Sequence, residues 1–266
     1  MSCTFPKYYE RKPKLLYRTH RKSLLIMSNA VAIVTESGFG KSTSYGQVPE
    51  LDIEGLDPKE TFLINVKGKP LPYRGWKKHW DPTPQTGNYL ASTDTALICK
   101  VLAAINNMPH IKHVVIDDYQ YILGEEFMKN ALKAGFDKFN KLSKNAYDVL
   151  NTGINLREDL NFFVLTHVEE VESNFKTTYK MKTIGKMLDN KITLEGLFTV
   201  VLYGKQEYDE KTGNISKKFV TNFDGQYPAK SPVGMFEEKY ILNDLGKVAK
   251  AIHAYNYGEE LEVENN

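Results

Sequence analysis

The sequence has few cysteines and no long apolar run. Cysteine occurs only at Cys3 and Cys99 among 266 residues, so neither a disulfide framework nor a cysteine-based zinc site can form. The longest uncharged apolar runs, 30–34 and 198–203, are far shorter than the roughly 20 residues that cross a bilayer. No segment has the layout of a secretory signal. These absences predict a cytoplasmic protein without membrane contact.

Arginine is scarce after residue 25, where only Arg74 and Arg157 occur, and the net charge is only +2. Residues 1–25 nevertheless hold seven basic residues against one acidic residue, whereas 259–266 hold four glutamates. We interpret 259–266 as a solvated acidic tail. For 1–26, three interpretations stay open: a solvated leader, a basic arm that binds phosphate backbones, or a stretch that is not translated because synthesis starts at Met27.

Apolar runs alternate with helical patterns through the first two thirds of the chain. The expected strands are 30–35, 61–66, 113–116 and 161–166. Helices are expected from a cap at Thr93 to about Asn107, and from Gly124 to about Leu150, where apolar residues that include Leu132 and Phe136 recur at helical spacing. Because parallel strands need long crossover connections, this alternation predicts a largely parallel sheet covered by helices.

The last third has a different pattern. Strand-like segments at 197–208 and 215–223 flank the turn sequence 209–214, which predicts an antiparallel hairpin. A final helix is expected from near Asn243 to about Tyr255. The predicted fold is therefore α/β, with antiparallel strands added near the C-terminus of a single domain over 27–258.

A glycine-rich turn follows the first expected strand. It ends in Gly40-Lys41-Ser42, which matches the second half of the phosphate-loop pattern G-x-x-x-x-G-K-[ST], while Thr35 stands at the first glycine position. Lys41 would neutralise phosphate charge, Ser42 would ligate Mg²⁺, and the next helix would point its positive end at the anion. The alternative is an ordinary glycine turn between a strand and a helix. The residues predicted to bind ATP are Ser37, Gly38, Phe39, Gly40, Lys41, Ser42 and Thr43.

Two acids end the strand at 113–116. We predict that Asp117 reaches Mg²⁺ through water, from the strand beside the phosphate loop, and that Asp118 polarises the attacking water. The competing interpretation is a capped loop, because an apolar strand followed by two aspartates is common. Ser42 and Asp117 are thus the expected metal residues.

Another strand ends in Thr166 and His167. These polar side chains are placed where a sensor of the terminal phosphate would lie. The alternative is a polar strand terminus in which His167 bonds to the backbone. A metal role for His167 is not expected, because no other histidine stands at ligand spacing.

At this point the chain resembles a known family, the bacteriophage-encoded AAA/RecA-like ATPases, some of which accompany single-strand annealing and recombination. The resemblance covers roughly 28–236 and rests on five segments: Ser37–Thr43, Leu71–Trp76, Val114–Asp118, Phe163–His167 and Ala229–Pro232.

The resemblance implies a RecA-like core, Mg²⁺-dependent ATP hydrolysis and assembly into a ring or filament in the host cytoplasm. In such assemblies a basic residue of one subunit completes the ATP site of its neighbour. Lys230 is the expected residue, with Lys182 and Lys186 as further candidates, and its charge would stabilise the transition state.

The leading functional hypothesis is an ATPase of DNA recombination or replication that acts with single-stranded DNA and a partner protein. Lysines and aromatic residues interleave at 67–80, which suits either DNA binding or packing of a long loop onto the core. A small-molecule or nucleotide kinase is one alternative, against which the scarcity of arginine argues. A nucleotide-gated assembly protein with little turnover is another, favoured by Thr35 and by the lack of an unambiguous catalytic glutamate.

Overall fold

The fold is built on one sheet with strand order β3-β2-β4-β5-β1-β7-β8-β9 and with β6 paired to β5. The computed structural model describes residues 27–129, 131–132, 137–173, 176–183, 193–208, 210, 213 and 215–258. The predicted basic arm and acidic tail lie outside these ranges. The strands are β1 (Asn29–Thr35), β2 (Thr61–Asn65), β3 (Tyr89–Leu90), β4 (His113–Asp117), β5 (Asn161–Ser173), β6 (Lys176–Met181), β7 (Val200–Tyr208), β8 (Ile215–Val220) and β9 (Tyr240–Leu242).

The strand directions confirm the predicted α/β fold. β1 runs parallel to both of its neighbours, β5 and β7, and β2, β3 and β4 continue the parallel part. β8 pairs antiparallel with β7, and β9 with β8. The parallel core is therefore extended by antiparallel strands from the last third of the chain, as the sequence indicates.

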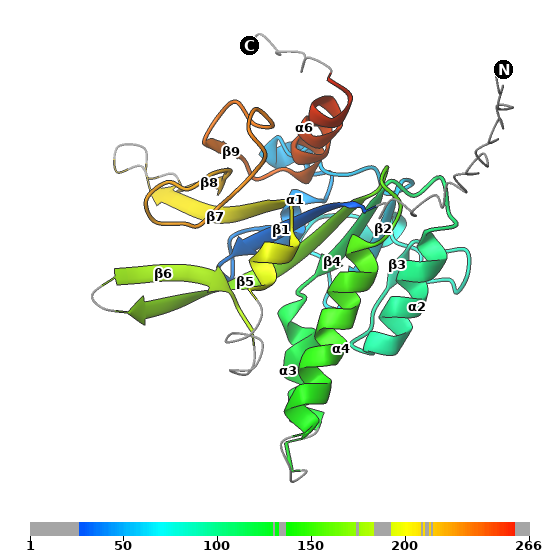
Figure 1. Cartoon of the computed structure of the whole chain (residues 1–266). Helices are drawn as coiled ribbons and strands as arrows, with labels where there is room; N and C mark the ends of the chain where they lie inside the picture. Colours follow the sequence, from blue (N-terminus) through cyan, green and yellow to red (C-terminus); the bar gives the residue numbers. More distant parts are fainter. Residues whose placement is uncertain are drawn as a thin grey trace, which may run out of the picture.

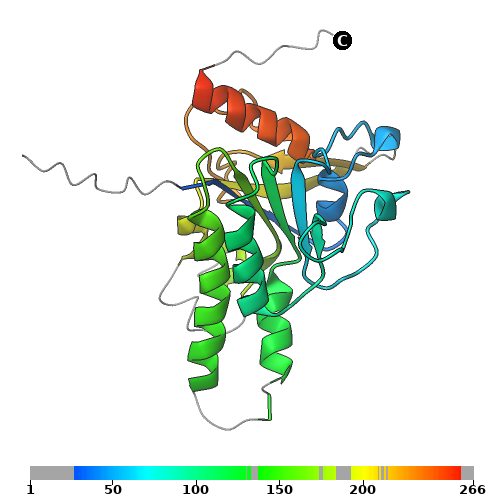
Figure 2. The same ribbon diagram turned by 90° about the vertical axis from the view of Figure 1, so that its right-hand side faces the viewer.

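Helices cover both faces of the sheet. The helices α2, α3 and α4 lie on one face and α6 on the other (Figures 1 and 2). Within the described ranges, no helix combines the length and the apolar character needed to cross a membrane. The helices are α1 (Lys41–Ser44), α2 (Thr95–Ile105), α3 (Gln120–Lys129), α4 (Asp137–Ile154) and α6 (Leu245–Tyr257), with 3-10 turns at Pro49–Leu51, Trp76–Lys78 and Leu194–Leu197.

The central strand β1 contributes to two hydrophobic layers. Ala30, Ala32 and Val34 face the layer that α2 and α4 cover, whereas Val31 and Ile33 face the layer under α6. Side chains of a strand point alternately to opposite faces, so a strand covered on both faces is apolar at every position. This explains why 30–34 is a continuous apolar run.

The helix predicted over 124–150 is wrong as one element, because the structure has α3 and α4 there. Leu132, which was expected on the apolar face, is fully exposed between them. Gly135, a poor helix former, stands in the intervening sequence. Phe136 lies outside the described residues.

The predicted cap of the preceding helix is also wrong by one position. Asp94, not Thr93, caps α2, because its carboxylate accepts hydrogen bonds from the backbone N–H groups of Ala96 and Leu97. An ionised carboxylate is a strong acceptor for these otherwise unpaired donors.

The loop at 67–80 packs onto the core through its aromatic residues. Trp80 is only 4% exposed, and its indole N–H donates to the Tyr73 hydroxyl at 2.7 Å. Tyr45 makes edge-to-face contacts with both rings, and Trp76 packs partly buried against the same cluster. The aromatic side chains of 67–80 therefore pack onto the core, as one of the two interpretations of this segment predicts.

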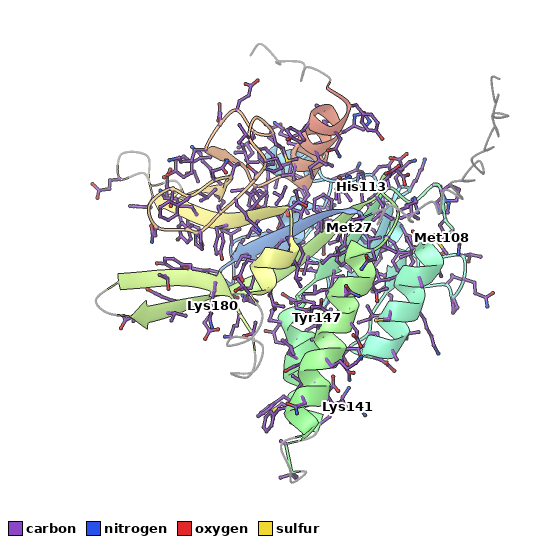
Figure 3. The ribbon with its side chains drawn as sticks, in the orientation of Figure 1. Met27, Met108, His113, Lys141, Tyr147 and Lys180 are labelled. Carbon is purple, nitrogen blue, oxygen red and sulfur yellow. The ribbon has the colours of Figure 1, made fainter. Side chains whose placement is uncertain are left out.

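A half-buried histidine at the start of β4 is expected to make the fold sensitive to acid. His113 begins β4 at the end of the sheet where Met27 lies (Figure 3). Burial lowers the pKa of His113 from 6.5 to about 4, so its ring is neutral near pH 7. Its Nδ1 lies 3.1 Å from Nδ2 of Asn161, an amide nitrogen that can only donate.

Unfolding is expected to become easier as the pH falls from about 6.5 to about 4, because the unfolded chain takes up a proton that the folded His113 resists. Urea titrations near pH 7 and at about pH 4.5 measure this effect. His113→Gln is expected to reduce the difference between the two free energies of unfolding. His110→Gln, which alters an exposed histidine, is the control, and equal pH dependence in both variants would contradict the prediction.

Candidate nucleotide-binding site

The loop after β1 turns its backbone toward a cleft at the carboxyl end of the parallel strands. Gly38 and Gly40 have φ values of 78° and 104°, a region that residues with a side chain seldom adopt. Phe39, between them, is 1% exposed and stacks on Phe219, with ring centroids 6.0 Å apart. Phe39 was predicted as an ATP contact, and only its backbone is free for that role, because its side chain anchors the loop in the core.

Thr35, at the first glycine position of the pattern, points away from the cleft. It is fully buried at the end of β1, and a Cβ at Gly204 of β7 would lie 2.6 Å from Thr35 Cγ2. The neighbouring strand thus accommodates the threonine side chain with a glycine of its own. The substitution therefore alters the packing between two strands and adds no side chain to the lining of the cleft.

The helix expected after the loop is a single turn, α1, of four residues. A helix does follow the loop as predicted, with Gly40 as its N-cap, but the aligned dipoles of one turn are few and add little positive charge. Contacts from the last third of the chain hold the loop instead. Lys217 of β8 donates to the carbonyl of Gly38 at 2.8 Å, and the amide of Asn243 donates to the carbonyl of Gly40 at 3.1 Å.

Lys41 and Ser42 are the first residues of α1, and they lie near the two acids Asp117 and Asp118. Lys41 is only 6% exposed; burial lowers the pKa of its amine, while the nearby carboxylates of Asp118 and Asp117 raise it. The hydroxyl of Ser42 donates to Oδ2 of Asp117 at 2.6 Å. The buried ammonium of Lys41 lies beside two carboxylates, and the oxygens of a bound polyphosphate could accept hydrogen bonds from the same ammonium.

Asp117 is 3% exposed, and one of its carboxylate oxygens has no hydrogen-bond partner. Ser42 and Tyr45 both donate to Oδ2, whereas Oδ1 is buried and unpaired among the described residues. Burial raises the pKa of the Asp117 carboxyl, and the charge of Asp118 raises it further. A buried carboxylate with a free oxygen beside a serine hydroxyl fits the oxygen chemistry of Mg²⁺.

The acid strand does not lie beside the strand of the phosphate loop, so that part of the prediction is wrong. β5 lies between β1 and β4. Asp117 nevertheless reaches the loop, because Ser42 and Tyr45 extend from the α1 turn to its carboxylate. The interposed strand brings His167 to the same edge of the sheet.

Within the described ranges, no group of three or more histidines, cysteines or acids is arranged to hold a metal ion by itself. Mg²⁺ commonly keeps several waters and takes one or two carboxylates together with substrate phosphates. Ser42 and Asp117 are the residues that would hold it.

Asp118 sits in a strained turn with φ 64°, and three side chains lie near its carboxylate. Lys69 approaches its Oδ2 at 3.1 Å, while Gln120 and His167 approach its Oδ1 at 3.5 Å and 3.7 Å. Burial, followed by the charge of Lys41, lowers the pKa of His167 to about 4. The His167 contact is therefore made by a neutral ring near pH 7, which suits a hydrogen-bonding sensor better than an ion pair.

Thr166 is brought to this edge but not into the cleft. Its side chain is fully buried, and its hydroxyl donates to Oε1 of Gln120 at 3.2 Å. The backbone N–H of His167 donates to the same oxygen at 3.3 Å. Thr166 therefore helps to position Gln120, which in turn contacts Asp118.

Of the lysines predicted from the resemblance, the two that the structure describes do not line this cleft. Lys230 is exposed and pairs with Val201 through an isolated β-bridge, outside this cleft; its role toward a neighbouring subunit stays a prediction. Lys182 is exposed, and its backbone N–H donates to the carbonyl of His167 at 2.8 Å. Lys186 lies outside the described residues.

The cleft has a volume of about 370 Å³. Residues not predicted as part of the site also line it, among them Asn65, Lys69, Tyr121 and Lys217. Asn65 ends β2, so the rule that ligands bind at the carboxyl ends of parallel strands points to it. Nothing in the local sequence signals Lys217, because a hairpin brings it to the loop. The lining residues are Ser37, Gly38, Gly40, Lys41, Ser42, Thr43, Asn65, Lys69, Pro70, Leu71, Pro72, Asp117, Asp118, Tyr121, His167 and Lys217.

A glycine turn after the central parallel strand, a buried lysine and a Ser–Asp pair together define a P-loop type of α/β fold. Neither a protein-family model nor a curated protein sequence matches the chain. Among solved structures it is similar to the KaiC-like protein PH0186 from Pyrococcus horikoshii OT3, with 11% identity and a TM-score of 0.41 over 73% of this chain and 78% of that protein.

Proposed function

We propose that the chain binds ATP with Mg²⁺ in this cleft and hydrolyses it. The observation that supports this most directly is the Ser42–Asp117 pair at 2.6 Å, with Lys41 beside it on the glycine turn. One side chain for the metal, one carboxylate for its waters and one ammonium for the phosphates are the parts that P-loop hydrolysis requires.

Each residue has a distinct task in the proposed reaction. The N–H groups of the loop and Lys41 bind phosphate oxygens, and bound Mg²⁺ supplies further charge neutralisation. A water oxygen forms a bond to the terminal phosphorus while the bond from that phosphorus to the ADP oxygen breaks. Asp118 orients this water and accepts its proton, and neutral His167 donates a hydrogen bond to the terminal phosphate.

The second part of the proposal concerns the biological role of this ATPase. The motifs that resemble phage-type AAA/RecA-like ATPases support a role in DNA recombination or replication, with single-stranded DNA, a partner protein and an oligomer whose Lys230 completes a neighbouring site. The exposed basic residues Arg74, Lys77 and Lys78 offer charge for a phosphate backbone.

The test is steady-state ATP hydrolysis with Mg²⁺, with and without single-stranded DNA, with the Lys41→Ala variant as the blank. A rate that depends on Lys41 supports the ATPase, and a several-fold increase with DNA supports the DNA-linked role. A Lys41-dependent rate that ignores DNA would retain the ATPase and remove the DNA role. If the unaltered chain hydrolyses ATP no faster than the Lys41→Ala blank, the proposal that it is an ATPase is contradicted.

One observation favours a second candidate, a nucleotide-gated assembly protein with little turnover. The carboxylate of Asp118 is already paired with the ammonium of Lys69 at 3.1 Å, an arrangement that opposes its action as a base. Light scattering separates the two functions: this candidate predicts ATP-dependent growth in particle mass without phosphate release, and loss of that growth in Lys41→Ala.

A further inference from the structure

A second lysine, Lys69, lines the same cleft as Lys41. It follows β2 in a short turn that begins at Asn65, whose amide donates to the carbonyl of Lys69 at 2.8 Å. The backbone N–H of Gly68 donates back to the carbonyl of Asn65 at 3.1 Å. These two bonds fix the backbone from which the Lys69 side chain enters the site.

The ammonium group of Lys69 contacts Asp118 and Tyr121, and it can exchange these contacts for others. It lies 3.1 Å from Oδ2 of Asp118 and 4.7 Å from the ring centroid of Tyr121, and its side chain is 55% exposed. Solvent weakens an ion pair whose lysine end is this exposed, whereas charge-assisted bonds to phosphate oxygens are strong. A phosphate group placed beside Asp118 would therefore compete well for this lysine.

The position of Lys69 favours the terminal phosphate over the inner ones. Its partner Asp118 and the adjacent His167 lie at the ends of β4 and β5, while Lys41 and the glycine turn occupy the end of β1. Lys69 is close enough to Lys41 for its charge to lower the pKa of Lys41. Two ammonium groups that line one cleft are suited to bind one polyanion between them.

We propose that Lys69 is a catalytic residue that exchanges its contact with Asp118 for the terminal phosphate of ATP. This assignment rests on the proposed function. The chain then supplies within its own cleft a cation that stabilises the developing charge, and the released Asp118 oxygen becomes available to the attacking water. The inhibitory Lys69–Asp118 contact thus becomes a device that couples ATP binding to activation.

Lys67 is the matched control. It stands two positions earlier and also lies over the Tyr121 ring, with Nζ 5.2 Å from the centroid. Its ammonium is paired with Glu125, and it does not line the cleft. Lys67→Ala therefore removes the same charge from the same loop without removing a group that faces the nucleotide.

The experiment compares Lys69→Ala, Lys69→Arg and Lys67→Ala with the unaltered chain. It measures kcat for ATP hydrolysis and the Kd values of ATP and ADP with Mg²⁺, and thermal melting checks that each variant is folded. Lys69→Ala is expected to lower kcat on the order of a hundredfold, and to weaken ATP binding several-fold without changing the Kd of ADP. Lys69→Arg is expected to restore part of both, and Lys67→Ala to behave like the unaltered chain.

Two results would overturn the assignment of Lys69 alone: a Lys69→Ala variant that matches Lys67→Ala, or one that loses ATP and ADP affinity equally. The first would leave Lys69 as a surface residue, and the second would make it a structural part of the loop. Absence of Lys41-dependent ATP binding in the unaltered chain would overturn the proposed function and this assignment together.

Discussion

Asp117→Asn is expected to lower Mg²⁺-dependent ATP hydrolysis by a factor of about a hundred or more while the protein stays folded. Asparagine has the same shape, and its carbonyl oxygen can still accept the bonds from Ser42 and Tyr45 that Asp117 Oδ2 accepts now. What it lacks is the negative charge that draws the hydrated metal to the phosphates. Loss of one preorganised charge in a water-poor site costs this much in turnover.

The free energy of unfolding of Asp117→Asn is expected to rise, although its turnover falls. Because burial raises the pKa of the Asp117 carboxyl, its ionised form is the unfavourable one in the fold, and removing the charge relieves that cost. Phosphate release measured against Mg²⁺ concentration, together with urea unfolding, reports both effects. Asp94→Asn is the control, since asparagine also serves well as a helix cap. A variant that keeps its turnover but unfolds more easily would show that Asp117 only caps its loop.

Asp244→Ala is expected to lower the free energy of unfolding by about 3 kcal/mol. Asp244 is fully buried and caps α6 by accepting from the N–H of Gly246 at 2.8 Å. It also accepts from Glu54 N at 2.8 Å and from Gly55 N at 3.0 Å. The substitution removes one acceptor from three backbone donors and separates α6 from the loop at 54–55.

Asp94→Ala is the matched comparison for this effect. Asp94 also caps a helix, but it is exposed and bonds only to backbone of its own helix, so the expected loss is about 1 kcal/mol. Urea titration of both variants under one set of conditions gives the difference directly. Equal losses would indicate that the long-range bonds of Asp244 contribute nothing beyond its cap.

The buried parallel strands were predictable because each is a short apolar run between turns. The runs at 30–35, 61–66, 113–116 and 161–166 correspond to β1, β2, β4 and β5. Their polar ends were predictable as well, since carboxyl ends of parallel strands meet at one edge. The hairpin of β7 and β8 was signalled by the turn sequence between them.

Other features depend on contacts that local sequence does not carry. β5 continues as far as Ser173 and pairs with β6, forming a hairpin that projects at the left of Figure 1. Its glutamates, lysines and threonines give no apolar alternation, so no strand was predicted there. The cleft positions of Lys69 and Lys217 follow from how a turn and a hairpin fold back on the sheet. Sequence spacing alone contains no information on such approaches.

The central place of β1 has a consequence for the order of events during synthesis on the ribosome. β1 emerges early, yet its two sheet neighbours, β5 and β7, emerge much later, and the loop contacts of Lys217 and Asn243 come later still. A nascent chain therefore carries an apolar strand with open edges until β5 and β7 have been made. Such long-range pairing folds slowly and leaves the growing polypeptide dependent on protection from aggregation until its last third is made.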